Sequence, residues 1–153
     1  MAESKVRIQK AKKGDFKNIV DLINELAAFE KLAGPDKKAV RRLYKDTFGK
    51  KKFTRMLVAK EGKAIIGYAI YFYSYSSFLA KKTLYLEDIC ITLAKRNSGI
   101  GKLFFKKLIS IAKKQDCGRM EWAVLDWNSD AIAFYDKTGA KPLSDWKYYR
   151  LVL

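Results

Sequence analysis

The segment that most constrains the fold is residues 84–93, LYLEDICITL, because it is apolar almost without interruption. Such a run is too short to cross a bilayer and is typical of a strand that is covered on both faces. It leads into a glycine-containing loop and then into residues 99–115, where an apolar stripe at helical spacing alternates with lysines. A buried strand, a glycine loop and an amphipathic helix in this order predict an α/β chain.

Hydrophobic periodicity places further elements on both sides of this unit. Asp15 and Asp36 stand where helix N-caps are expected, and residues 61–63 suit a hairpin turn. We expect strands at 6–9, 55–60, 64–75, 84–93, 120–125 and 146–153, and helices at 15–31, 36–48, 99–115 and 129–138. The order β-α-α-β-β-β-α-β-α-β predicts a partly antiparallel, partly parallel sheet with helices on both faces. No repeat or linker interrupts it, so we expect one domain over residues 1–153.

Composition excludes several classes of function. The chain has no histidine, which removes His-based catalytic triads and leaves few ligands for zinc, so no metal is expected. Its two cysteines, Cys90 and Cys117, cannot form a disulfide framework, and the first residues lack the apolar stretch of a signal peptide. We therefore expect a cytoplasmic protein that does not enter the membrane.

The formal net charge, 32 − 16 = +16, favours an anionic partner such as nucleic acid, a membrane surface or a phosphorylated cofactor. A solvated surface of scattered lysines would account for the same charge. The sequence contains no nucleic-acid-binding motif. A basic nucleic-acid-binding module without catalysis is therefore a remote alternative, and a nucleic-acid partner is not expected.

The loop of residues 96–101, RNSGIG, is the first of three groups of residues that can carry chemistry. The start of a helix leaves backbone N–H groups unpaired, and the helix dipole favours an anion there. Gly99 and Gly101 permit close approach, and Arg96 and Lys102 add positive charge. The loop therefore suits a pyrophosphate, although a plain turn that starts a helix has a similar pattern. It matches neither the P-loop nor the dinucleotide-binding fingerprint.

The second and third groups are acidic and aromatic. Glu87 and Asp88 are neighbours in the apolar strand, so alternation predicts one carboxylate in each layer. Such a pair can bind a cationic substrate or act as a base, or Asp88 can simply accept backbone hydrogen bonds. In the third group, Asn128 suits a helix N-cap, and Tyr135 lies two turns into that helix, where it serves packing or catalysis.

In this order and spacing, the three groups resemble the GNAT superfamily of N-acetyltransferases. Residues 96–101 match its acetyl-CoA motif R-x-x-G-x-G, and residues 128–140 match its N…A…F-Y…G-A segment. Residues 24–31, NELAAFEK, and 84–88, LYLED, are similar to the spermidine/spermine (diamine) acetyltransferase branch, which includes thialysine-acetylating relatives. The similarity covers nearly the whole chain. It implies the GNAT-type α/β fold, with a central mixed, mostly antiparallel sheet and helices on both faces.

The resemblance also implies an enzymatic activity and the residues that would carry it out. The acetyl group of acetyl-CoA would pass by direct attack to a primary amine of a small polyamine, diamine or lysine-like (thialysine) acceptor, with a protein or peptide amine as the alternative. Tyr135 would protonate the leaving thiolate, and Glu87 would bind the amine and help to remove its proton. The residues implied to hold acetyl-CoA are Ile89, Cys90, Ile91, Arg96, Asn97, Ser98, Gly99, Ile100, Gly101, Lys102, Asn128, Ser129, Asp130 and Ala131. Those implied to contact the acceptor are Phe29, Glu30, Glu87, Asp88, Glu121, Trp122 and Ala123.

The resemblance further implies a homodimer, and the sequence departs from the family pattern at internal positions. Asn97 stands where relatives often have glycine, and Glu121-Trp122 differs in type from the residues usual there. A charge of +16 also repels a cationic acceptor at long range. A local acidic cluster, for which the candidates are Glu30, Glu87, Asp88 and Asp126, would have to overcome this repulsion.

Overall fold

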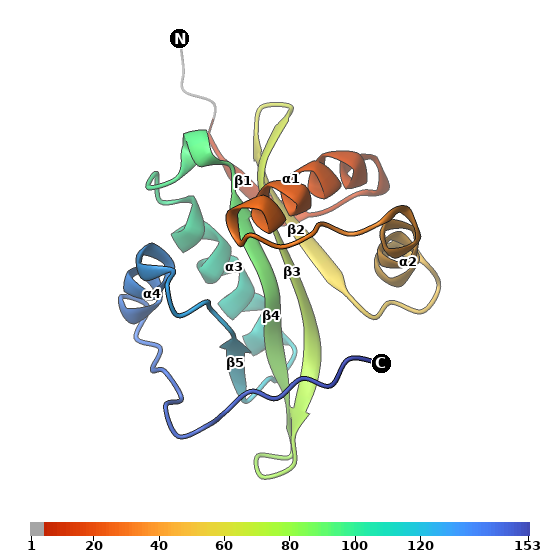
Figure 1. Cartoon of the computed structure of the whole chain (residues 1–153). Helices are drawn as coiled ribbons and strands as arrows, with labels where there is room; N and C mark the ends of the chain where they lie inside the picture. The colour runs from red at the N-terminus through yellow and green to blue at the C-terminus, as the bar shows by residue number, and fades with distance from the viewer. Residues whose placement is uncertain (1–4) are drawn as a thin grey trace. The chain divides into compact units, whose positions relative to one another are not determined.

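The computed structural model describes residues 5–153 and divides the chain into two compact units, the first ending at Trp122 and the second spanning residues 123–153 (Figure 1). Each unit is described by itself. The first contains β1 (Arg7–Lys10), the 3-10 turn η1 (Lys13–Asp15), α1 (Phe16–Phe29), α2 (Lys37–Phe48), β2 (Arg55–Glu61), β3 (Ala64–Ser76), β4 (Lys81–Ile91), the 3-10 turn η2 (Leu93–Lys95), α3 (Ile100–Lys114) and β5 (Arg119–Trp122). The second contains α4 (Ser129–Asp136).

The strands form one sheet in the order β1-β2-β3-β4-β5. β1 to β4 are antiparallel neighbours, and β5 joins β4 in parallel. Gly62, with a φ of 61°, makes the tight turn between β2 and β3, because a left-handed backbone costs glycine little. The expected mixed, mostly antiparallel sheet is confirmed.

Helices cover both faces of this sheet. On one face, Val58 and Tyr68 belong to a core cluster with Ile19 of α1, and Leu43 of α2 packs against that cluster. On the other face, a Cβ added at Gly67 would lie 3.3 Å from the Phe104 ring of α3. Since neighbouring strand residues point to opposite faces, α1 and α3 lie on opposite sides of the sheet, as Figure 1 also shows.

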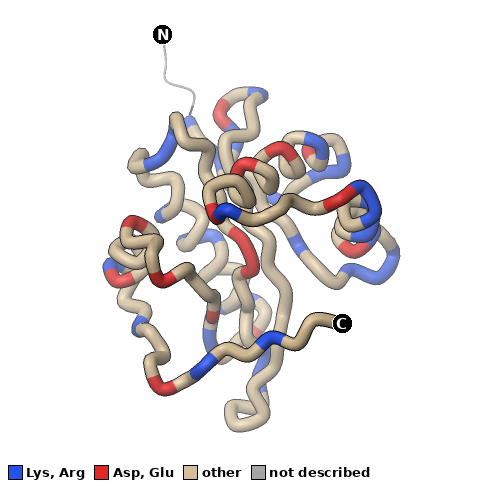
Figure 2. The backbone as a smooth tube through the Cα atoms, in the orientation of Figure 1, with Lys and Arg blue, Asp and Glu red and all other residues tan. Residues whose placement is uncertain are grey.

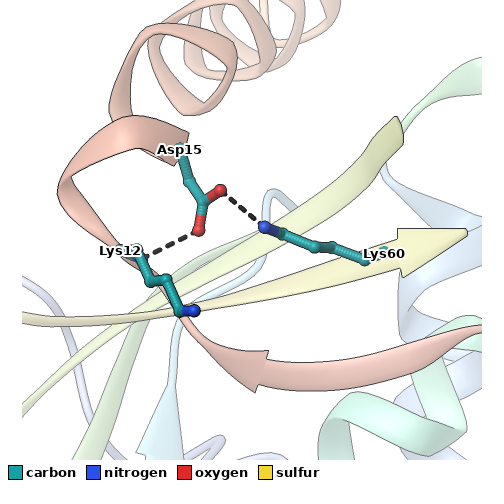
Figure 3. Close-up of polar contacts among 3 residues, drawn as sticks. All are labelled: Lys12, Asp15 and Lys60. Atoms are coloured by element: carbon teal, nitrogen blue, oxygen red, sulfur yellow. Dashed lines mark hydrogen bonds and ion pairs between the residues drawn. The ribbon is translucent and has the colours of Figure 1, made fainter. Parts of the chain in front are cut away.

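The two expected N-caps have different outcomes. Asp36 caps α2 as predicted, because its Oδ1 accepts a hydrogen bond from the backbone N–H of Ala39 at 2.7 Å. Asp15 precedes α1 but makes no side-chain cap there. Its carboxylate instead accepts the Lys12 backbone N–H at 2.8 Å and the Lys60 ammonium at 2.6 Å (Figure 3). Asp15 therefore ties the turn before α1 to β2.

Two other expectations are wrong. No strand forms over residues 146–153, which pair with no other strand in the described part of the chain; the side chain of Tyr149, for example, is 89% exposed. An alternating pattern suits a strand but does not supply a partner. In α3, the expected apolar stripe was Ile100, Leu103, Phe104, Leu108 and Ile111, but Leu103 is 41% exposed and Phe105, which lay outside the stripe, is buried. None of the helices within residues 5–153 is both long and apolar enough to traverse a bilayer.

Candidate active site

The acidic pair of β4 lies at a β-bulge. Asp88 pairs with Ile70 of β3, but Leu86 pairs with Tyr71, so Glu87 is an extra residue without a partner in β3. Glu87 is exposed, and Asp88 is half-buried on the face that packs against α1. The prediction of one carboxylate in each layer is therefore wrong, because a bulge interrupts the strict alternation on which it relied.

Asp88 is the centre of an acidic cluster. The Tyr68 hydroxyl, on a fully buried side chain, donates to Asp88 Oδ2 at 3.4 Å. Burial, together with the negative charges of Glu87 and Glu30, raises the pKa of Asp88 to about 6. Three of the four predicted acidic residues thus act on one another, and Asp126 belongs to the second unit. A carboxylate whose pKa lies near neutrality is suited to accept a proton from a bound group.

The edge of β4 beyond the bulge is open on the side of β5. Pairing with β5 covers only Thr83 to Leu86, so residues 87–91 have β3 as their one strand neighbour among the described residues. The Thr92 N–H donates to the Ile66 carbonyl at 2.9 Å, which fixes the alternation of the antiparallel ladder.

This alternation shows which way the backbone groups point in the three residues that were expected to bind the cofactor. The N–H and C=O groups of Cys90 point toward β3, whereas those of Ile89 and Ile91 point toward the open edge. The backbone of Cys90 is therefore engaged with β3, and cofactor binding by the backbone of Ile89 and Ile91 stays a prediction. Its thiol is buried, and burial raises the pKa of Cys90 to about 11, so the sulfur is not ionised at neutral pH.

Arg96 connects β4 to the end of α1. Its Nε donates to the Ile91 carbonyl at 3.1 Å, and its guanidinium lies 4.8 Å from the centre of the Phe29 ring. Nearby, the Glu25 carboxylate of α1 accepts the Leu93 N–H at 3.0 Å. Arg96 was expected to add charge at the pyrophosphate loop, but in the structure its side chain holds α1 against the end of β4. The sequence analysis did not identify Glu25 or Tyr68, since each occurs in an ordinary amphipathic or aromatic stretch.

The loop that follows has an unusual backbone. Asn97 and Gly99 have φ values of 60° and 81°, in the left-handed region, and the Ser98 hydroxyl donates to the Lys95 carbonyl at 2.5 Å. No side chain caps the start of α3 at Gly99. A Cβ at Gly99 would meet nothing within 4 Å, so glycine is required there by φ and not by crowding. No side-chain cap therefore occupies the first N–H groups of α3, and anion binding by residues 97–102 stays a prediction.

A hollow of about 650 Å³ opens beside this loop. Its lining residues are Lys5, Val6, Glu61, Lys95, Ser98, Ile100 and Leu103. The Lys95 ammonium and the Glu61 carboxylate form an ion pair at 2.6 Å there. The hollow therefore borders the start of α3 but not the acidic cluster.

The two predicted acceptor contacts on β5 lie on opposite faces of the sheet. The Trp122 ring packs edge-on against Phe105 of α3, with 5.2 Å between ring centres. Glu121 pairs with Tyr85, which contacts Phe72 on the α1 face, and its carboxylate accepts from Arg119 Nε at 3.0 Å. Only Glu121 therefore shares the face of Asp88.

The second unit holds the remaining predicted site residues. Asn128 Oδ1 accepts the Ala131 N–H at 3.3 Å, which confirms Asn128 as the N-cap of α4. The Tyr135 ring lies 5.5 Å from that of Phe134, and Gly139 adopts a φ of 84° after the helix. The predicted roles of Ala123, Asn128, Ser129, Asp130, Ala131 and Tyr135 toward acetyl-CoA and the acceptor stay predictions. Within residues 5–153, no three His, Cys, Asp or Glu side chains gather as a metal site would require.

Comparison with known proteins agrees with this geometry. Residues 19–140 match the model of the acetyltransferase (GNAT) family. The chain is 37% identical over 156 residues to the thialysine N-epsilon-acetyltransferase of Bos taurus, covering 95% of this chain and 91% of that protein. It is 34% identical to the human spermidine/spermine N(1)-acetyltransferase-like protein 1, covering 94% of this chain and 22% of that longer protein.

The fold also matches solved structures. A possible acetyltransferase from Clostridium difficile superposes with a TM-score of 0.83 over 97% of this chain and 98% of that one, at 18% identity. The resemblance to the spermidine/spermine and thialysine branch is confirmed by the two relatives. Family match and relatives together show that the chain belongs to the acetyltransferase (GNAT) family and is an N-acetyltransferase enzyme.

Proposed function

We propose that this enzyme transfers the acetyl group of acetyl-CoA to a primary amine of a small diamine, polyamine or thialysine-like acceptor. The observation that carries the proposal is the acidic cluster of Asp88, Glu87 and Glu30, which lies at the bulge where the open edge of β4 begins. The relative from Bos taurus is named for acetylating the ε-amine of thialysine, which supports an acceptor of this kind.

The residues of the first unit fit acetyl-CoA. The backbone groups of Ile89 and the Ile91 N–H face an open strand edge, where the amides of a pantetheine arm can add hydrogen bonds as a further strand would. The Ile91 carbonyl already accepts from Arg96 Nε. The uncapped start of α3 suits the pyrophosphate, and Lys102 adds positive charge. When bound, acetyl-CoA supplies an acetyl group activated as a thioester.

The acidic cluster has two tasks toward the amine. Exposed Glu87, together with Glu30, attracts the protonated amine over the roughly 8–10 Å within which charges act at physiological salt, and this local attraction offsets the overall charge of +16. Asp88, with a pKa of about 6, is ionised at neutral pH and can take the proton, directly or through water. We infer that Asp88 is the base and that Glu87 binds the cation, whereas the sequence alone favoured Glu87 for both. Tyr135 would donate a proton to the departing thiolate.

The test is a thiol-release assay with acetyl-CoA and five acceptors: thialysine, lysine, spermidine, a short diamine and a lysine-containing peptide. We expect turnover of at least one small amine at a higher kcat/KM than the peptide. Asp88→Asn and Tyr135→Phe should each lower kcat by about 100-fold, the lower end of the rate acceleration that a general base or acid contributes. The matched control is Asp21→Asn, which should leave kcat unchanged. Asp21 is an exposed carboxylate on α1 whose ion pair among the described residues is with Lys17 at 3.2 Å.

Two results would count against the proposed acceptor, and a third against the proposed acid. Absence of turnover with every small amine would refute small-amine acetylation, and a clear preference for the peptide would favour the protein-acceptor alternative. An unchanged kcat in Tyr135→Phe would remove that residue from the mechanism while leaving the acceptor assignment in place.

A further inference from the structure

A dense group of basic residues lies on α2 and the loop after it. Eight basic residues lie there, and all of them are exposed: Lys37, Lys38, Arg41, Arg42, Lys45, Lys50, Lys51 and Lys52. Figure 2 shows this concentration of blue on α2 and the following loop. We call these eight residues the α2 basic surface. The expectation of evenly scattered lysines does not hold for this part of the chain.

The α2 basic surface has little acidic compensation. Only Asp36 and Asp46 occur within residues 36–52, and the Asp36 carboxylate already accepts the Ala39 N–H. The ion pairs found in the described part of the chain use other cations, namely Lys17, Lys60, Lys81, Lys95 and Arg119. The eight cations are therefore available to an anionic partner.

The helix holds these cations in a fixed arrangement. Residues 37, 41 and 45, and residues 38 and 42, recur at i,i+4 spacing, so they form a stripe with about 5–6 Å between successive Cβ atoms. The side of α2 that carries Leu43 packs against the core, and the rings of Tyr44 and Phe48, which border the stripe, lie 5.1 and 5.9 Å from that of Phe16. Because Leu43 and Phe48 are packed and Tyr44 is only 38% exposed, α2 offers little apolar surface to insert into a bilayer.

An exposed aromatic ring adjoins the stripe. Phe53 follows the three lysines directly, and its N–H donates to the Asp46 carbonyl near the end of α2 at 2.8 Å. Its side chain is 69% exposed. The Phe53 ring stacks on that of Phe72, with 5.9 Å between ring centres and 20° between planes. One face of the ring is thus supported, and the residue remains largely open to solvent.

We propose that the α2 basic surface and Phe53 bind single-stranded nucleic acid, in addition to the catalytic activity. Cations that follow a phosphate backbone, together with an aromatic ring on which an unpaired base can stack, are the two elements of single-strand recognition. A duplex would leave the ring unused, because its bases are already stacked on one another. An anionic membrane would interact with the same cations, but the exposed Phe53 ring, already stacked on Phe72, offers little apolar area for insertion. The proposal is independent of which amine the enzyme acetylates.

The experiment measures fluorescence anisotropy of a labelled RNA of about 20 uridines with the full chain between about 0.05 and 0.3 M salt. One variant replaces Lys38, Arg41, Arg42 and Lys45 of α2 with glutamine. The charge-matched control replaces Lys106, Lys107, Lys113 and Lys114 of α3 with glutamine. We expect the α2 variant to bind at least about 10-fold more weakly, with the slope of log K against log salt reduced by about 0.7 for each phosphate that it no longer neutralises. The α3 variant should bind within about threefold of the unmodified chain.

Phe53→Ala tests the ring separately and keeps the charge. It should weaken binding by at least about fivefold, which corresponds to the lower end of the stacking energy between a base and an aromatic ring. Phe78→Ala, which removes a 98% exposed ring in the β3–β4 turn, is its control and should have no effect. Circular dichroism melts establish that each variant is folded. If the α2 variant fails to fold, the Phe53→Ala and Phe78→Ala pair still decides the question.

Several outcomes would overturn the proposal. Equal weakening in the two charge-matched variants would mean that only net charge attracts RNA. Tighter binding to a duplex of the same length, or to vesicles with about 30% anionic lipid, would assign the surface to another polyanion. Unchanged RNA binding in Phe53→Ala would remove the stacking interaction on which the choice of a single strand rests.

Discussion

Asp88 has a pKa of about 6 in the folded chain against an ordinary value of 3.8, and replacing it with asparagine tests this difference directly. About 2 pKa units, at 1.36 kcal/mol each, correspond to about 3 kcal/mol by which the folded chain disfavours the ionised carboxylate. Asparagine keeps the shape of the side chain and an oxygen that can accept from Tyr68, but it carries no charge. We therefore expect Asp88→Asn to raise the free energy of unfolding by up to about 3 kcal/mol at pH 8.

The sign follows from where each state holds its proton. Between about pH 4 and pH 6 the folded chain keeps the Asp88 proton that the unfolded chain has released, so Asp88 lowers stability progressively as pH rises through this window. The advantage of Asp88→Asn should therefore be small near pH 4, grow up to about pH 6 and remain constant above it. Urea unfolding of both proteins at pH 4.5, 6 and 8 measures this curve.

Asp15→Asn is the matched control because it should behave in the opposite way. Burial raises the pKa of Asp15, but the hydrogen bond and charge of Lys60 and the Lys12 N–H outweigh burial, so the pKa lies below 3.8. Its ionised form therefore stabilises the fold above that value, and Asp15→Asn should cost about 2 kcal/mol at pH 7, less as pH falls through the acidic range. A loss of stability in Asp88→Asn that is equal at pH 4.5 and pH 8 would refute the reasoning about Asp88.

Three further predictions concern the surroundings of this site. Tyr68→Phe removes a hydrogen bond that lowers the pKa of Asp88, so the acidic limb of the kcat/KM profile should move to higher pH by about half a unit, measured in a pH–rate series. Gly67→Ala would place a Cβ 2.9 Å from a carbonyl oxygen of β4, and thermal unfolding should show a loss of about 1–3 kcal/mol. Gly99→Ala should lower the free energy of unfolding by about 1 kcal/mol and raise the KM for acetyl-CoA, because residue 99 has a φ of 81°. Asn97→Gly should change that KM by less than about twofold, since residue 97 already adopts a φ of 60°.

Much of the first unit could be predicted from periodicity and caps. The stripe in α3 and the apolar run of β4 located both elements to within three residues, because one-sided or two-sided burial imposes a regular spacing on the sequence. The β2–β3 turn followed from Gly62. The strand expected at 146–153 shows the limit of this approach, since a strand depends on a partner whose availability is not encoded in the segment itself.

The site was less predictable than the fold because its geometry depends on register. Side-chain spacing could show that Glu87 and Asp88 are adjacent, but not that an extra residue separates the pairs Ile70–Asp88 and Tyr71–Leu86. The orientation of the Arg96 side chain could not be predicted from the sequence either. A loop arginine beside a glycine motif suits a phosphate, and only the contacts of Arg96 with Phe29 and the Ile91 carbonyl reveal its structural use.

The bulge, the open strand edge and the acidic cluster have a common origin in this unit. A bulge bends its strand and increases the local twist. β5 runs parallel to β4 as far as the pair Leu86–Trp122, the last position before the extra residue Glu87, and its pairing ends there. The residue that interrupts the register thus coincides with the point where the neighbouring strand separates, which exposes the backbone groups of Ile89 and Ile91. The same shift in register turns Asp88 toward Tyr68 and the end of α1. One inserted residue thus accounts for both the open edge and the position of the acidic cluster, the two features on which the proposed sites for the acetyl donor and the amine rest.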